Sequence, residues 1–205
     1  MKESAVKTTD AYNLSAKEYE KVISLNQTYL EQIQQFAELF QNGDEILDVG
    51  CGPGKNAQIL SNNGLAITGL DSSSAMIELA KENCPKGNFI LSEAQSLRMD
   101  KKFKGICLSF IIVHLSDTDA EKLLQSVSEH IEKEGYVYLS FMTGKEAGFE
   151  ITSFSSNKIF FNYYEPDYII SVMEQKGLKN ISHKMYGYTE TDGSITDEHF
   201  MIFKK

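Results

Sequence analysis

Hydrophobic and polar positions follow a helical pattern near the start of the chain. Between Ser15 and Phe40, apolar residues recur about every three to four positions, which places them on one face of a helix. Ser15 and Glu18 form a candidate capping box at its start, and Asn42-Gly43 is a typical stop signal. We therefore predict one amphipathic helix over this range, which serves as a lid or a packing layer.

Beyond this helix, short runs rich in β-branched and aromatic residues alternate with helical runs. Strands are predicted over EILDV, LAITGL, NFILS, GICLSF and GYVYLSFM. Helices are predicted over residues 55–61 and 73–83, and over a run that begins with the capping box of Ser116 and Asp119, DTDAEKLLQSVSEHIEK. Alternating strands and helices pair in parallel through right-handed crossovers. The pattern predicts a doubly wound α/β sheet with helices on both faces.

The last third of the chain has a different character. Residues 143–164 are polar and aromatic without clean periodicity, whereas EPDYIISVMEQKG is typical of a helix closed by Gly177. Two strands are predicted after it, LKNISHKMYGY and DEHFMIFKK. With 205 residues and no repeat or linker, we expect a single domain with one core.

Composition and charge narrow the range of partners and compartments. The chain has 20 Lys+Arg against 29 Asp+Glu, a net charge of -9, and no basic patch that would attract nucleic acid or an anionic membrane. Its three cysteines match neither a zinc site nor a disulfide framework, and no run is typical of a signal peptide or a membrane span. We expect a cytoplasmic protein, a monomer or homodimer, that uses no metal and binds neither nucleic acid nor membrane.

Three glycines directly follow the first predicted strand, at Gly50, Gly52 and Gly54. A turn from a strand into a helix exposes unpaired N–H groups, and glycine lets a ligand approach that backbone closely. Asp71 ends the next predicted strand, 21 residues beyond Gly50, where an acid can accept hydrogen bonds from ribose hydroxyls. The alternative is a tight turn with Asp71 as a helix cap, but the spacing favours a site for a nucleotide-like ligand.

Asp48 distinguishes between the possible ligands. The dinucleotide fingerprint is G-x-G-x-x-G, whereas this chain has Asp48 two residues before Gly50 and a third glycine one position early. A carboxylate repels a pyrophosphate but attracts an ammonium or sulfonium group. The ligand is therefore expected to carry positive charge, and a nicotinamide enzyme is disfavoured.

At these residues the sequence resembles the class I S-adenosylmethionine-dependent methyltransferases. ILDVGCGPG is similar to their first motif and GLDSSSAMIELAK to their acid-terminated second strand, while FILSEAQSL, CLSFIIVHL and GYVYLSFM are similar to later motifs. The resemblance implies a Rossmann-like, seven-stranded, mostly parallel sheet with a C-terminal antiparallel hairpin. It divides the single domain 1–205 into a helical lid (1–43), a cofactor-binding half (44–142), and a substrate-side insert, helix and closing hairpin (143–205).

The resemblance also implies a cofactor and the residues that bind it. The cofactor is S-adenosylmethionine, which becomes S-adenosylhomocysteine. Asp48 and the loop from Gly50 to Gly54, with Cys51 inside it, hold the methionine end, and Asp71 binds both ribose hydroxyls. Five further residues surround the adenine and the amino group: Ser72, Met76, Glu93, Ala94 and, through its backbone, Phe110. Glu93 is a departure, because Asp is common there.

Methyl transfer from a sulfonium is an in-line displacement, so the enzyme mainly aligns the reactants and excludes water. A general base is needed only for a nucleophile that arrives protonated. His114, at a strand end, is the candidate for that base or for a hydrogen bond to the substrate, and capping of the helix from Ser116 is an equally weighted alternative. The candidate acceptor-binding residues are Tyr12, Tyr19, His114, Tyr163 and Tyr164.

We conclude from the sequence that methyl transfer to a small-molecule acceptor is the leading hypothesis. Family members that methylate amino groups of bases or glutamine carry an Asn- or Asp-Pro-Pro-aromatic run where this chain has SFIIVHL. Two alternatives stay open: a module that binds the cofactor without catalysis, and a methyltransferase for protein or RNA.

Overall fold

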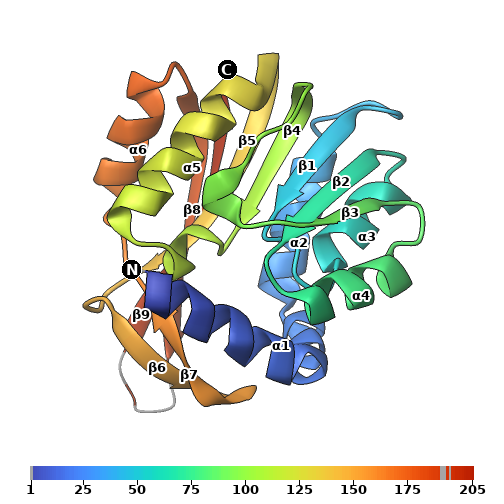
Figure 1. Ribbon diagram of the computed structural model, residues 1–205. Helices are drawn as coiled ribbons and strands as arrows, with labels where there is room; N and C mark the ends of the chain where they lie inside the picture. Colours follow the sequence, from blue (N-terminus) through green and yellow to red (C-terminus); the bar gives the residue numbers. More distant parts are fainter. Residues whose placement is uncertain (1, 190–192, 194) are drawn as a thin grey trace.

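The structure is a computed structural model that describes residues 2–189, 193 and 195–205. Within these residues a seven-stranded sheet has the order β3-β2-β1-β4-β5-β9-β8 (Figure 1). Its strands are β1 (Glu45–Val49), β2 (Ala66–Asp71), β3 (Asn88–Leu91), β4 (Phe103–Ser109), β5 (Ile131–Thr143), β8 (Lys179–Thr189) and β9 (Ile195–Lys204).

Strand direction and register confirm the predicted fold. Strands β1 to β5 pair in parallel, and β9 is antiparallel to both β5 and β8. In the middle of the sheet, Asp48 of β1 lies opposite Gly69 of β2 and Cys107 of β4. The strand order changes direction between β1 and β4, and a crevice forms past the carboxyl ends of strands at such a point.

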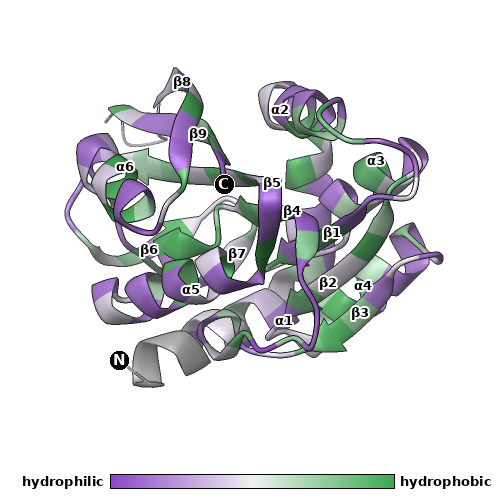
Figure 2. Ribbon diagram, turned by 90° about the horizontal axis from the view of Figure 1, so that it is seen from above, coloured by the Kyte–Doolittle hydropathy of each residue, from purple (hydrophilic) through white to green (hydrophobic). Residues whose placement is uncertain are grey.

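Helices cover both faces of this sheet. The helices are α1 (Lys2–Leu25), α2 (Gln27–Ala37), α3 (Lys55–Asn62), α4 (Ser74–Asn83), α5 (Asp117–His130) and α6 (Pro166–Gln175), with short 3-10 turns η1 (Ala94–Ser96) and η2 (Ile112–His114). One core lies between the sheet and α2, α3 and α4, and the other lies between the sheet and α5 and α6. Apolar segments accordingly gather on the strands, while the outward helix faces are polar (Figure 2).

The prediction of one helix over residues 15–40 is wrong. The first helix begins at Lys2 and is kinked at Ser15, and a second helix begins after Asn26. The Ser15 hydroxyl donates to the carbonyl of Ala11 at 2.6 Å, so Ser15 does not cap a helix with Glu18. Serine inside a helix bonds back to the preceding turn in this way and bends it. The second helix is capped by Asn26, whose side chain accepts from the N–H of Tyr29.

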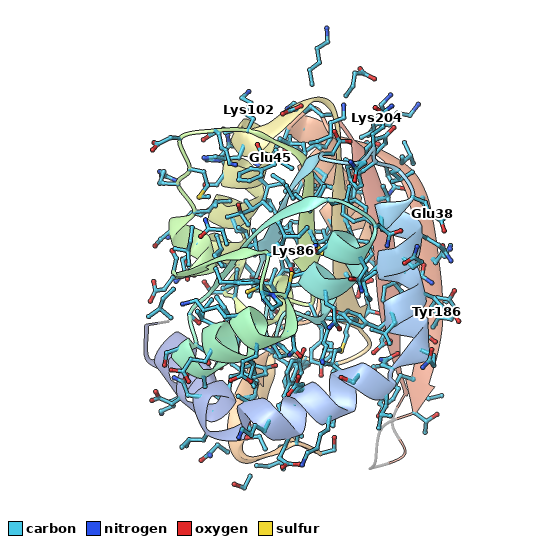
Figure 3. The ribbon with its side chains drawn as sticks, turned by 90° about the vertical axis from the view of Figure 1, so that its right-hand side faces the viewer. Glu38, Glu45, Lys86, Lys102, Tyr186 and Lys204 are labelled. Atoms are coloured by element: carbon cyan, nitrogen blue, oxygen red, sulfur yellow. The ribbon has the colours of Figure 1, made fainter. Side chains whose placement is uncertain are left out.

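Only the first of these two helices lies over the carboxyl end of the sheet. The apolar side of α2, including Ile33 and Phe36, is buried against a sheet face. Figure 1 shows α1 crossing the end of the sheet, and Figure 3 shows the labelled Glu45, Lys102 and Lys204 at the opposite end. Residues 1–43 were predicted to form a helical lid. Of the two helices in this range, only α1 is positioned to cover the carboxyl end of the sheet (Figure 1).

The irregular segment predicted over residues 143–164 contains two strands. β6 (Gly148–Thr152) and β7 (Ser155–Phe161) form an antiparallel pair separate from the main sheet. The Thr8 hydroxyl of α1 accepts a hydrogen bond from the N–H of Phe160 at 3.1 Å. This hairpin therefore lies beside α1 at the same end of the sheet (Figure 1). The helix from Ser116 is capped as predicted but ends at His130, where β5 follows at once.

Candidate active site

The carboxyl ends of β1 to β4 open into one cavity beneath α1, with about 750 Å³ of space between atoms when its open mouth is included. It brings together most of the residues that the sequence suggested: Tyr12, Tyr19, Gly50, Gly52, Asp71, Ser72, Met76, Glu93, Ala94, Phe110 and His114. Seven further lining residues were not predicted: Thr8, Thr9, Ser73, Gln95, Ser109, Ile111 and Leu115. Thr8 and Thr9 were missed because the first helix was predicted to begin too late. The other five adjoin named positions, so the motif spacing was the available signal for them.

The three glycines have left-handed φ angles and serve different purposes. A Cβ on Gly54 would lie 2.8 Å from the main chain of Ala80 in α4, so this glycine admits the neighbouring helix. A Cβ on Gly50 would lie 2.6 Å from the Ile111 side chain. On Gly52 the nearest atom would be Tyr19 Cε1 at 3.6 Å, which leaves room above the backbone. Gly50 and Gly52 line the cavity, whereas Gly54 does not.

Asp71 joins the loop after β1 to the loop after β2. Its carboxylate accepts from the N–H of Gly52 at 2.9 Å and from the N–H of Ser73 at 2.8 Å. Burial raises the pKa of Asp71 above its usual range, while the backbone N–H groups act in the opposite direction. The cap of α4 is Ser73, whose hydroxyl accepts from the N–H of Met76. Asp71 therefore shapes the glycine loop, and the helix-cap alternative does not describe it.

Asp48 lies beneath the loop and is fully buried. Neither carboxylate oxygen has a hydrogen-bond partner among the described residues, and the side chain is not part of the cavity wall. Burial raises the pKa of Asp48 to about 7. The neighbouring side chains of Asn56 and Cys107 oppose this rise, and the charge of Asp71 adds a smaller rise. A buried carboxylate without partners is costly, so this group would gain from a cation nearby.

The pH dependence of stability tests this environment. Because the folded-state pKa of Asp48 is raised to about 7, the folded protein holds its proton more tightly than the unfolded chain does. The contribution of Asp48 to the free energy of unfolding is therefore largest at acid pH, and it is lost as the pH rises through about 7. Between about pH 5 and pH 8, we expect the parent to lose about 2 kcal/mol of unfolding free energy relative to Asp48→Asn. Urea unfolding of both proteins measures this, and parallel pH curves would contradict it.

His114 lies in the cavity wall at the end of η2, opposite α1. Its Nε2 is 2.9 Å from the Tyr12 hydroxyl, and its Nδ1 is 2.9 Å from the carbonyl oxygen of Phe160. Burial lowers the pKa of His114 to about 4, so the ring is neutral at neutral pH. The helix from Ser116 is capped by Ser116 itself, which excludes a capping role for His114.

Phe110 follows β4 and has an unusual backbone. Its φ of 50 is rare for a residue other than glycine, and such strain is often found at functional sites. Its N–H donates to the Ser140 hydroxyl at 3.0 Å. The backbone group that Phe110 can offer to a ligand is therefore its carbonyl.

Besides Asp48 and Gly54, three more of the named residues lie away from the cavity wall. Cys51 is buried, and burial raises the pKa of its thiol well above the ordinary value. The Tyr163 hydroxyl donates to Glu150 at 2.5 Å, outside the cavity. Tyr164 is buried, and its hydroxyl lies within hydrogen-bond distance of the carbonyls of Ile112 and Leu115, which flank His114. Tyr164 therefore supports the turn that positions His114.

Helix α1 is tied to the cavity rim by polar contacts. The hydroxyls of Thr9 and Ser72 are 2.9 Å apart. The Asn13 amide oxygen accepts from the Ser73 hydroxyl at 2.6 Å and from the N–H of Ala75 at 3.2 Å. Closing this rim reduces the access of water to the cavity.

The described part of the chain contains neither a candidate metal site nor a candidate membrane span. No three His, Cys, Asp or Glu side chains gather there in a way that could hold a metal ion. None of its helices has the length and apolar character needed to cross a membrane.

Comparison of the sequence with known families identifies the family of this chain. The sequence model of a family described as a methyltransferase domain matches residues 21–183. The chain belongs to this methyltransferase domain family. The resemblance to class I S-adenosylmethionine-dependent methyltransferases is thereby confirmed.

Curated relatives of this methyltransferase include enzymes of quinone biosynthesis. A demethylmenaquinone methyltransferase of Thermotoga maritima is 26% identical over 166 residues, which cover 67% of this chain and 71% of the relative. A ubiquinone biosynthesis O-methyltransferase of Rickettsia akari is 32% identical over 100 residues, 47% of this chain and 39% of the relative.

Solved structures share the fold at low identity. One of them is the 1,6-didemethyltoxoflavin-N1-methyltransferase of Burkholderia thailandensis, with bound 1,6-didemethyltoxoflavin and S-adenosylhomocysteine. Its TM-score is 0.76 at 12% identity, and the match covers 99% of this chain and 89% of the other chain. Magnesium protoporphyrin IX methyltransferase of Synechocystis, with bound S-adenosylhomocysteine, has a TM-score of 0.74 at 13% identity, over 98% of this chain and 99% of its own.

Proposed function

We propose that this methyltransferase transfers the methyl group of S-adenosylmethionine to a small-molecule acceptor in the cavity beneath α1, leaving S-adenosylhomocysteine. The observation that carries the proposal is the convergence of Gly52, Asp71 and the unpartnered carboxylate of Asp48 at the switch point of the sheet. This combination suits a ligand that has both a ribose and a positive charge.

The residues present fit that cofactor. Asp71 lies in the cavity wall at the end of β2, where its carboxylate can also accept from ribose hydroxyls. The open space above Gly52 lets a ligand contact the main chain. Asp48 supplies negative charge in a low-dielectric setting, where attraction to an ammonium or sulfonium group is strong. When bound, the cofactor supplies an electrophilic methyl group on a positively charged sulfur.

The protein contributes binding, alignment and exclusion of water. The loops after β1 to β4 converge on the cavity, so one rigid sheet edge holds the cofactor residues in place. Tyr12 and Tyr19 of α1 close the cavity from the other side. Holding two reactants in line in this way lowers the entropic part of the barrier.

The charges of the cavity wall and of the whole chain support an acceptor that is small and uncharged. No Lys or Arg is among the described residues that line the cavity, so a phosphate or carboxylate acceptor would lack a counter-ion there. The net charge of -9 disfavours RNA as a partner. Two relatives also support a small-molecule acceptor by their names, demethylmenaquinone methyltransferase and ubiquinone biosynthesis O-methyltransferase.

Calorimetric titration with S-adenosylhomocysteine, with NAD run in parallel, tests the cofactor assignment. We expect S-adenosylhomocysteine to bind with a Kd on the order of 1–10 μM, about -7 to -8 kcal/mol, and NAD not to bind. Transfer of radiolabelled methyl to a panel of small molecules then tests catalysis. Folded protein that does not bind S-adenosylhomocysteine would contradict the proposal, and binding without transfer to any acceptor would favour the non-catalytic module.

A further inference from the structure

The cavity has a second part that the cofactor residues do not account for. Away from the loops after β2 and β3, its wall is formed by Tyr12, Tyr19, Ile111, His114 and Leu115. The acidic side chains of the wall, Asp71 and Glu93, belong to those two loops, at the ends of β2 and β3. Thr8, Thr9 and Ser109 add hydroxyl groups, so this part of the wall is largely aromatic and apolar and carries no formal charge.

Within it, Tyr12 and His114 form a polar pair with a defined direction. A carbonyl oxygen can only accept, so the contact with Phe160 requires the hydrogen of His114 to be on Nδ1. Nε2 then has a free lone pair, which accepts the Tyr12 hydroxyl hydrogen at 2.9 Å. The lone pairs of the Tyr12 oxygen stay available to accept a hydrogen bond from a ligand.

Neighbouring rings hold this pair in place. Tyr12 stacks on Phe154 at 5.7 Å between ring centroids and meets the edge of Tyr19 at 5.2 Å. The His114 ring contacts Phe161 at 5.0 Å. Groups that act in proton transfer need such fixed positions, and aromatic walls suit a flat apolar acceptor.

We propose that Tyr12 and His114 accept the proton of a hydroxylated aromatic acceptor, a phenol or a hydroquinone, which this enzyme methylates on oxygen. The inference rests on the proposed function and deepens it by naming the acceptor class and the acceptor atom. It assigns to Tyr12 contact with the substrate hydroxyl and to His114 the final acceptance of the proton.

The atoms and charges of this step balance. The acceptor oxygen bonds to the methyl carbon while the carbon–sulfur bond breaks, with its electron pair staying on sulfur. The acceptor proton passes to the Tyr12 oxygen as the Tyr12 proton passes to Nε2 of His114. A sulfonium and a neutral imidazole thus become a thioether and an imidazolium, which later releases its proton to water.

This conservation of charge explains how a weakly basic histidine can serve. Burial lowers the pKa of His114 to about 4, which disfavours a positive charge in the site. In the proposed step that charge arrives as the sulfonium charge disappears, so the site never holds both. Burial raises the pKa of Tyr12, and the other titratable groups that act on the pair, Tyr19 and Asp71, raise it further.

An acceptor panel provides the first test. The intact protein is given S-adenosylmethionine with phenols, hydroquinones, anilines, thiophenols and benzoates, and the products are identified by mass spectrometry. We expect O-methylated phenols or hydroquinones. Transfer only to nitrogen, sulfur or carboxylate, or no transfer to any phenol by protein that binds S-adenosylhomocysteine, would overturn the inference. Failure of S-adenosylhomocysteine to bind would instead refute the proposed function.

Two variants then test the roles of the pair. Tyr12→Phe removes the hydroxyl but keeps the ring, and His114→Gln keeps an acceptor but cannot take a full proton. We expect kcat/KM for an unsubstituted phenol to fall about 100-fold or more in each, as is typical of lost acid–base catalysis. With 4-nitrophenol, which is largely ionised at about pH 8, the loss should be less than about tenfold because no proton has to be removed. Equal losses for both phenols would indicate a merely structural role.

Controls and a second readout separate chemistry from folding. Tyr168→Phe removes a surface hydroxyl that bonds to Glu121, and we expect it to behave like the parent. All variants should bind S-adenosylhomocysteine as the parent does. Nitrogen-15 NMR of the histidine rings should show His114 neutral with its hydrogen on Nδ1. The opposite tautomer, or a charged ring at neutral pH, would overturn the assignment.

Discussion

Asp71→Ala is expected to lower the affinity for S-adenosylhomocysteine by about 100-fold or more. Two ribose hydroxyls that each lose a charged partner account for about 3 kcal/mol, or about two powers of ten in Kd. The variant also leaves the N–H groups of Gly52 and Ser73 without the carboxylate that now joins their loops. Calorimetry with S-adenosylhomocysteine measures the affinity, and thermal unfolding without ligand measures the effect on the loops.

The matched control for this experiment is Glu78→Ala. Glu78 is an exposed acid on α4, the helix that follows the Asp71 loop, and it does not line the cavity. Its removal changes the net charge by the same amount, so affinity should stay within about twofold of the parent. A loss of less than about fivefold in Asp71→Ala would refute the assigned role of Asp71.

Gly54→Ala is expected mainly to lower the stability of the fold, whereas Gly52→Ala is expected mainly to lower the affinity for the ligand. At Gly54 (φ 78), a methyl group would lie 2.8 Å from the α4 main chain, which cannot yield as a flexible side chain can. Left-handed strain and overpacking together should cost about 3 kcal/mol, which lowers the melting temperature by about 10 °C. At Gly52 (φ 51) the nearest atom is 3.6 Å away, so only the strain of about 1 kcal/mol is expected.

Ligand binding should show the reverse order for this pair. The methyl group of Gly52→Ala occupies the space where a ligand meets the main chain, so affinity for S-adenosylhomocysteine should fall at least about tenfold. Folded Gly54→Ala should keep most of its affinity. Gly148→Ala, where nothing lies within 4 Å of the new methyl group, is the control and should change stability by less than about 0.5 kcal/mol. Similar binding in the Gly52 and Gly54 variants would contradict the division of roles.

The two proposals describe two parts of one site, the donor part and the acceptor part. Asp48, Gly52 and Asp71 belong to the edge of the sheet and explain how the donor is held, whereas Tyr12 and His114 come from α1 and η2 and face the acceptor. A fold of this kind carries many acceptor pockets, so its architecture alone leaves the acceptor open. The acceptor class is instead inferred from the absence of cations on the described cavity wall and from the direction of one hydrogen bond.

Features set by local sequence could be predicted without the structure. The strand of residues 45–49, the glycines after it and the acid at the end of the next strand lie within one short stretch. Their spacing is enough to indicate a nucleotide-like site, because backbone geometry and nearby polar groups decide such a turn. The Ser116 cap is equally local, since the residues involved lie three positions apart.

Features that depend on distant contacts needed the tertiary structure. Tyr12 and His114 are 102 positions apart, and Thr8 and Phe160 are 152 positions apart, yet each pair is hydrogen bonded. The β6–β7 pair was missed because its residues show no clean periodicity, and the structure places them beside α1. The special need for glycine at position 54 comes from α4, which no local pattern shows.

The sequence by itself therefore determined the fold class, the family and the residues now proposed for the donor site, because these depend on periodicity and on motifs a few residues long. Only the tertiary structure decided that α1 alone covers the carboxyl end of the sheet (Figure 1), that Gly54 serves packing, and that His114 pairs with Tyr12. The physical reason is that side-chain direction, burial and tautomer are set by neighbours in space, and folding brings those neighbours together from remote parts of the chain.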